Sequence, residues 1–172
     1  MADGILLPPL ARGTLLAVPE RLARLDEALP QIRAVLEGET DAVAIEATLA
    51  CLLWETLVHT NWCGFYRRRG ERTLAVGPYH GGMGCLRIDF ARGVCGACAR
   101  TAELQLVPDV TLFPGHISCD DATRSELVLP VVIAGRVEAV LDLDSPHLDA
   151  FTMDEAHRLE TLLAEAFASA RL

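Results

Sequence analysis

Two apolar, β-branched segments in the C-terminal half of the chain constrain its fold more than any other feature. Ser125–Ile133 and Arg136–Leu143 are separated only by Ala134-Gly135, which is the length of a tight hairpin turn. Upstream, Asn61–Arg67 and Arg72–Gly77 flank an arginine/glycine turn in the same way. Because a hairpin makes its two strands antiparallel neighbours, the sequence predicts a mostly antiparallel sheet.

Helical patterns precede and follow these hairpins. Apolar residues three and four apart predict a helix over Pro19–Leu36, and a turn with cap candidates introduces a second helix over Ala42–His59. Thr152 and Glu155 have the spacing of a capping box and predict a last helix over Met153–Ala168. Shorter elements are expected in between, with strands at Leu86–Phe90 and Leu104–Val107, a helix at Val94–Ala102 and a long loop at Pro108–Thr123.

This order of elements indicates an α+β fold in which a central, mostly antiparallel β-sheet is flanked by helices. Residues 1–18 are rich in proline and leucine without a clear period, so we expect an irregular N-terminal extension. Residues 19–172 are then a single domain, which suits a chain of 172 residues.

Composition excludes several classes of function. A net charge of −9 argues against nucleic-acid binding, because phosphate contacts need a basic face, and Arg67-Arg68-Arg69 is expected to be a solvated hairpin tip. No apolar run approaches the ~18 residues of a membrane span, and the first residues lack the basic start of a signal peptide. We therefore expect a cytoplasmic protein whose six cysteines are reduced, catalytic or metal-binding.

Three cysteines in glycine-flanked loops, Cys85, Cys95 and Cys119, are the candidates for thiol chemistry. Only the thiolate is nucleophilic, and Cys119 lies in a polar loop three residues after His116, which either assists it or caps the loop. Cys95 and Cys98 form a CxxC pair near a helix start, and with His116 and Cys119 they have the outline of a zinc site.

The remaining thiols favour packing over chemistry. Cys98 lies between two alanines about one helical turn after Cys95, which indicates packing rather than metal binding. Cys51 lies in an apolar helix and Cys63 alternates in a strand, so both are expected in the core.

Acidic side chains on apolar strands are the second candidate group. Asp142 and Asp144 are two apart on one strand and therefore face the same side, and Glu126 opens the neighbouring strand of the hairpin. Either this is an ordinary solvent face, or the three acids share a pocket, where at least one holds a proton near neutrality. Trp62 and Tyr66, four apart on another strand, are core residues or the wall of that pocket.

Five ordered motifs resemble the free methionine-(R)-sulfoxide reductases, which are single GAF-type domains. The resemblance covers about residues 38–168 and rests on Asn61-Trp62-x-Gly64-Phe65-Tyr66, Gly93-Val94-Cys95-Gly96, Gly115-His116-Ile117-x-Cys119-Asp120, Ser125-Glu126-x-Val128-Leu129-Pro130 and Leu141-Asp142-x-Asp144-Ser145.

The resemblance implies a reaction for the cysteines. Cys119 would attack the sulfoxide sulfur and become a sulfenic acid, Cys85 would resolve it as a disulfide, and Cys95 would be auxiliary, with the order of Cys85 and Cys95 left open. Thioredoxin would reduce the disulfide, with NADPH as the distal source of electrons. No bound cofactor and no metal are expected, and pairing through terminal helices, common in GAF domains, would give a homodimer.

The resemblance also assigns the pocket. Glu126, Asp142 and Asp144 would hold free methionine-R-sulfoxide and supply the proton, with Glu126 and Asp144 counted as catalytic, while Trp62 and Tyr66 would surround the methyl group. The chain departs from the pattern in its extra thiols Cys63 and Cys98, in its N-terminal extension, and in the glycine-rich approach to Cys85, which suggests a mobile loop. A GAF-type sensor that binds a small ligand without catalysis is the alternative.

Overall fold

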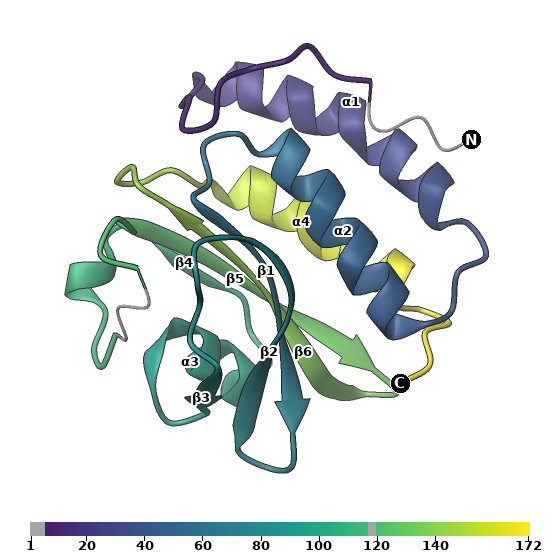
Figure 1. The fold of residues 1–172 in the computed structure, drawn as a ribbon, viewed down its shortest axis with the longest axis vertical. Helices are drawn as coiled ribbons and strands as arrows, with labels where there is room; N and C mark the ends of the chain where they lie inside the picture. The colour runs from purple at the N-terminus through teal and green to yellow at the C-terminus, as the bar shows by residue number, and fades with distance from the viewer. Residues whose placement is uncertain (1–5, 117–119) are drawn as a thin grey trace.

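The computed structural model describes residues 6–116 and 120–172 (Figure 1). Ten regular helices and strands and one short 3-10 helix follow one another along these residues: α1 Val18–Leu36, α2 Ala42–Thr56, β1 Trp62–Arg69, β2 Thr73–Gly81, β3 Arg87–Asp89, α3 Gly93–Thr101, β4 Gln105–Val107, η1 Val110–Leu112, β5 Ser125–Ile133, β6 Arg136–Ser145 and α4 Met153–Ala166. Both predicted hairpins and all four predicted helices are therefore confirmed, with shifts of a few residues at their ends.

The six strands form one sheet in the order β3-β2-β1-β6-β5-β4, and each neighbouring pair is antiparallel. The two hairpins meet where β1 pairs with β6, so the first hairpin and the last form the centre of the sheet. The predicted α+β class with an antiparallel sheet is confirmed.

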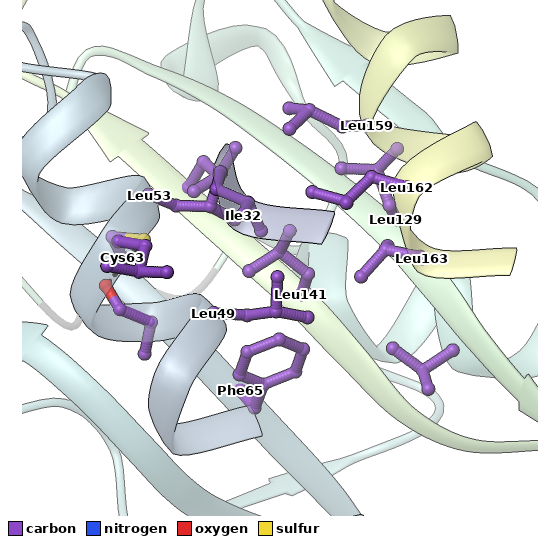
Figure 2. Close-up of a cluster of buried hydrophobic side chains, with 14 of the residues drawn as sticks. Ile32, Leu49, Leu53, Cys63, Phe65, Leu129, Leu141, Leu159, Leu162 and Leu163 are labelled. Atoms are coloured by element: carbon purple, nitrogen blue, oxygen red, sulfur yellow. Dashed lines mark hydrogen bonds between the residues drawn. The ribbon is translucent and has the colours of Figure 1, made fainter. Parts of the chain in front are cut away.

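Helices cover the two faces of the sheet unequally. In Figure 1, α1, α2 and α4 lie together on one side, and the short helix α3 lies on the other. Leucines of β5 and β6 point into the first layer, where they pack against α2 and α4 around Phe65 (Figure 2). Period-two alternation then directs the intervening residues of β5 and β6 toward α3. The polar side chains that interest us lie on that second face.

Capping interactions fix the ends of the helices on the first face. The Asp41 side chain accepts a hydrogen bond from the backbone N–H of Ala44 at the start of α2. At the start of α4, Thr152 and Glu155 form the predicted capping box.

Residues 6–17, the described part of the chain before α1, form no regular element and are anchored to the domain. The Gly13 backbone N–H donates to the Val58 carbonyl at 2.6 Å, and its carbonyl lies 2.8 Å from Nε2 of His147. The Arg12 guanidinium lies 3.6 Å from the ring centre of Trp54. The division of the chain at residue 18 into an extension and one domain stays a prediction.

Two expectations about side chains were wrong. Arg67 and Arg68 are not a solvated tip: Arg67 pairs with the buried Glu46 at 3.1 Å, and Arg68 donates to the Val137 carbonyl and stacks on Phe90. Their positions along β1 place them beside neighbouring strands rather than in the turn.

Cys51 is exposed, because it lies on the side of α2 that faces away from the sheet. Cys63 is buried in the core as expected (Figure 2). Within residues 6–116 and 120–172, no helix is long and apolar enough to cross a membrane.

Candidate functional site

A small cavity of about 30 Å³ lies on the face of the sheet that carries α3. Residues of β1, β3, β5, β6, α3 and the loops after β2 and η1 line it: Trp62, Tyr66, Met83, Gly84, Ile88, Gly93, Val94, Cys95, His116, Asp120, Thr123, Glu126, Asp142 and Asp144. Every described residue predicted to bind substrate therefore meets at one cavity, together with Cys95. Their roles in binding and catalysis stay predictions.

Strand register brings the three acids together. Glu126 of β5 lies directly opposite Asp144 of β6, and Asp142 lies opposite Val128. All three therefore project from the pocket face, while Leu127 and Leu143 project into the helical core. The side chains of Glu126 and Asp142 are each 5% exposed, which excludes the ordinary solvent face for this pair.

Burial decides the protonation of these acids. The pKa of Glu126 is raised well above its ordinary value, first by loss of solvent and then by the charges of Asp142 and Asp144. Burial likewise raises the pKa of Asp144, with Asp142 as the next cause. Burial raises the pKa of Asp142 only to about 6, because hydrogen bonds from Cys95 and Glu126 favour its charged form. Burial thus favours the protonated form of all three acids, and it does so least for Asp142, whose carboxylate accepts the two hydrogen bonds.

Cys95 lies at the base of the cavity, with its Sγ 3.9 Å from Oε1 of Glu126. It is 3% exposed, and burial followed by the nearby Asp142 and Glu126 charges raises the pKa of its thiol. Although Cys95 lies near the start of α3, its buried surroundings favour the thiol over the thiolate. The Cys98 thiol is fully buried in the core beneath α3, as its alanine neighbours predicted.

The other two candidate cysteines have different surroundings. Cys85 is half-buried, packs against the core beneath α3 and is disulfide-bonded. Cys119, the predicted nucleophile, lies outside the described residues. The described neighbours of that segment, His116 and Asp120, both line the cavity.

Stacked aromatic rings form one wall. The ring centres of Trp62 and Tyr66 are 5.3 Å apart, and those of Trp62 and Tyr79 are 5.1 Å apart. A Cβ added at Gly84 would lie 2.7 Å from the Tyr66 hydroxyl, so only glycine lets this loop lie against the wall. The glycine-rich approach to Cys85 thus has a packing reason.

Two buried polar atoms in the cavity have no hydrogen-bond partner among the described residues. They are Nε1 of Trp62, a donor, and Oδ1 of Asp142, an acceptor. Buried groups of this kind are costly unless something satisfies them. Because both residues line the same cavity, a polar ligand that carries both kinds of group would suit this site.

Other polar residues lie around the acids, and among them the sequence assigned candidate roles to His116 alone. The Asn61 amide donates to Oδ2 of Asp120 at 3.0 Å and to Oγ1 of Thr123 at 3.2 Å, which ties the loop before β5 to the start of β1. Nε2 of His116 lies 3.9 Å from Oε2 of Glu126, and burial lowers the pKa of the imidazole. Asn61 and Asp120 belong to the motifs that resemble the reductase family, and this was the only feature of the sequence that could have marked them as functional. No feature of the sequence marked Thr123 or Tyr79.

The raised pKa of Asp142 has a measurable effect on stability. A carboxyl whose pKa rises from 3.8 to about 6 on folding contributes stability that is fully present below pH 3.8 and lost as pH rises through 6. We therefore expect Asp142→Asn to be more stable than the parent at pH 8, by at most about 3 kcal/mol. The difference should close as pH falls from 6 toward 4. Urea unfolding of both proteins across this range measures it, and a gap that widens in acid would contradict the raised pKa.

Comparison with known proteins agrees with this geometry. The GAF domain family matches residues 23–170. The free methionine-R-sulfoxide reductase of Escherichia coli is 41% identical over 132 residues, covering 77% of this chain and 79% of that protein. The Saccharomyces cerevisiae protein of the same name is 36% identical over 145 residues, covering 80% of this chain and 81% of that protein.

A solved structure is similar to this chain in both sequence and fold. The Neisseria meningitidis free methionine-R-sulfoxide reductase, solved in complex with its substrate, is 36% identical and superposes with a TM-score of 0.81 over 94% of this chain and 97% of that one. Sequence identity, coverage and fold agree across these relatives, and the described residues predicted to bind substrate meet at one cavity with Cys95. The chain therefore belongs to the free methionine-R-sulfoxide reductases, a group of oxidoreductases built on the GAF domain.

Proposed function

We propose that this chain reduces free L-methionine-(R)-S-oxide to L-methionine. The observation that carries the proposal is the buried cluster of Glu126, Asp142 and Asp144 beside the Trp62–Tyr66 wall. The Asp142 carboxylate suits the α-ammonium of a free amino acid, and the two protonated acids suit an oxygen that must leave as part of a hydroxyl group. The aromatic rings suit the methyl group on sulfur.

The reaction divides into three balanced steps. Attack of the Cys119 thiolate on the sulfoxide sulfur forms a transient S–S bond. Protonation of the oxygen and its transfer to the Cys119 sulfur then break the substrate S–O bond and that S–S bond, so a Cys119 sulfenic acid remains and methionine leaves. The Cys85 thiol then displaces hydroxide from Cys119, which yields a disulfide and water. A dithiol reductant of the thioredoxin class, supplied with electrons by NADPH, returns both cysteines to thiols.

Substrate entry requires the rim of the cavity to move. A volume of about 30 Å³ holds roughly one water molecule, which is much less than methionine sulfoxide occupies. Met83, which is 82% exposed, and Gly84 form the outer side of this space, and they lie in the segment that leads to Cys85. Displacement of that segment widens the pocket without disturbing β5 or β6.

The experiment that tests the function uses racemic methionine sulfoxide with thioredoxin, thioredoxin reductase and NADPH. We expect NADPH consumption to stop when half of the substrate has reacted, because only the R epimer is reduced. Reduction of all of the racemic substrate would contradict the stereospecificity. No consumption would favour a GAF domain that binds a ligand without catalysis, provided that dithiothreitol as the reductant also failed.

Peptide substrates test the site proposed for the ammonium group. Asp142 is 5% exposed and therefore lies where an amide-linked residue cannot continue into solvent. We expect methionine sulfoxide with a free α-amino group to be reduced and N-acetylmethionine sulfoxide or an internal peptide residue to be ignored. Chromatographic detection of the product measures both, and efficient repair of the peptide would contradict this arrangement.

The resolving step is tested separately. We expect Cys85→Ser to release one methionine per chain and then stop, because the sulfenic acid forms but has no partner for the disulfide. Quenched single-turnover and steady-state assays with thioredoxin compare the two phases. Full steady-state activity in this variant would transfer the resolving role to Cys95.

A further inference from the structure

Three potential metal ligands from three separate elements meet at the base of the cavity. The Cys95 sulfur of α3 and carboxylate oxygens of Glu126 on β5 and Asp142 on β6 all lie within 4.8 Å of one another. Their residues are 3%, 5% and 5% exposed. The sulfur and two oxygens therefore face a shared, water-poor space from a rigid framework of strands and helix.

The spacing of these atoms is close to what one tetrahedral ion requires. With Zn–S near 2.3 Å and Zn–O near 2.0–2.2 Å, the sulfur and an oxygen on the same ion are about 3.6 Å apart. Sγ of Cys95 lies 3.9 Å from Oε1 of Glu126, so a small side-chain adjustment suffices. The cavity of about 30 Å³ has room for one bound water molecule beside a divalent ion, whose own volume is much smaller than that of the water.

An independent observation also indicates a ligand. Oδ1 of Asp142 is buried in the cavity and has no hydrogen-bond partner among the described residues. A cation is one of the few small species that satisfies a buried carboxylate oxygen.

We propose that Cys95, Glu126 and Asp142 bind one thiophilic divalent cation, such as Zn²⁺ or Cd²⁺, with water in the fourth position. A mixed sulfur and oxygen set selects these ions, whereas Mg²⁺ requires near-octahedral oxygen ligands. This set differs from the zinc site that the sequence suggested, because Cys98 is packed in the core. Binding displaces the protons of the Cys95 thiol and of Glu126, and no electron is transferred.

One consequence rests on the proposed function. The cation occupies the position proposed for the substrate's ammonium group, so it excludes substrate and inhibits turnover. Free zinc should therefore be a competitive inhibitor. The proposal that the three residues bind a metal does not depend on the proposed function, because it is argued from their geometry.

Cadmium titration of the fully reduced chain tests the site directly, because a thiolate bound to Cd²⁺ gives a charge-transfer absorption in the ultraviolet. We expect one equivalent bound by the parent and by Cys98→Ser, a matched variant with an equally buried thiol. Cys95→Ser should lose that equivalent's absorption, and Asp142→Asn should bind at least about tenfold more weakly. Titrating with circular dichroism in parallel shows that the variants are folded. Equal absorption in Cys95→Ser, or its loss in Cys98→Ser, would overturn the site.

Inhibition is measured in a separate assay of turnover with dithiol reductant, after correction for metal bound by the reductant. Zn²⁺ should raise the KM for methionine sulfoxide without lowering kcat, and equimolar Mg²⁺ should have no effect. Metal that binds at Cys95 without affecting KM would contradict the proposed substrate position and leave the metal site standing. The two failures are therefore distinguishable.

Discussion

Cys119→Ser should lose turnover by on the order of 10³-fold or more while the chain remains folded. A serine hydroxyl ionises far less readily than a thiol and cannot carry the sulfoxide oxygen as a stable acid. The surroundings of the other pocket thiol strengthen this expectation, because burial raises the pKa of Cys95 and leaves it a poor nucleophile. The Cys63 and Cys98 thiols are similarly kept protonated by burial, so these extra cysteines compete weakly in the disulfide relay.

Methionine release in a single turnover without external reductant measures this result. Cys51→Ser is the matched control, because Cys51 is exposed on α2 and lies outside the cavity. That variant should release one equivalent at the parent's rate. If Cys119→Ser also released a full equivalent, the nucleophile would have to be another cysteine.

Glu126→Gln and Asp144→Asn should lose about one to two decades of kcat/KM on free methionine sulfoxide. Hydrogen bonds from these acids to the sulfoxide oxygen, which gains charge as the S–O bond breaks, are of the charge-assisted kind worth ~1.5–3 kcal/mol. An amide also cannot replace a carboxylic acid as a proton donor. Both variants should nevertheless unfold at or above the parent's temperature at neutral pH. Each removes a group whose charged form is destabilised by burial and by its acidic neighbours.

Separate measurement of activity and stability distinguishes this prediction from simple loss of structure. Glu138→Gln is the control, because Glu138 is on the same strand as Asp144 but pairs with Arg136 outside the pocket. Its activity should match the parent's. Loss of activity together with a lower melting temperature in the pocket variants would assign these acids a structural role instead.

Local patterns in the sequence predicted the framework of the site. Hairpin turns fix which strands are neighbours, and period-two alternation then places Asp142 and Asp144 on one face opposite Glu126. The capping box at the start of α4 likewise depends only on Thr152 and a residue three positions later. These predictions succeeded because each depends on residues within a few positions or across one short turn.

Contacts between distant segments were not predictable in the same way. Asn61 reaches Asp120 across 59 residues, and this contact depends on how the loop before β5 crosses the sheet. Cys51 is exposed because α2 is rotated so that this side chain points outward. In a helix that is apolar on most sides, the sequence does not determine this rotation. The exclusion of solvent from the pocket could not be predicted from the sequence either, because it depends on how α3 packs over β5 and β6. This burial is also what raises the pKa of the Cys95 thiol.

The sheet ends on each side in a strand of only three residues, β3 at Arg87–Asp89 and β4 at Gln105–Val107. A long, open edge is a template on which a second chain can continue the hydrogen-bond ladder, and natural proteins shorten such edges to prevent it. Here β3 and β4 each offer only three residues of outer edge to an added strand. The shortness of these two terminal strands therefore disfavours edge-to-edge pairing of chains along them.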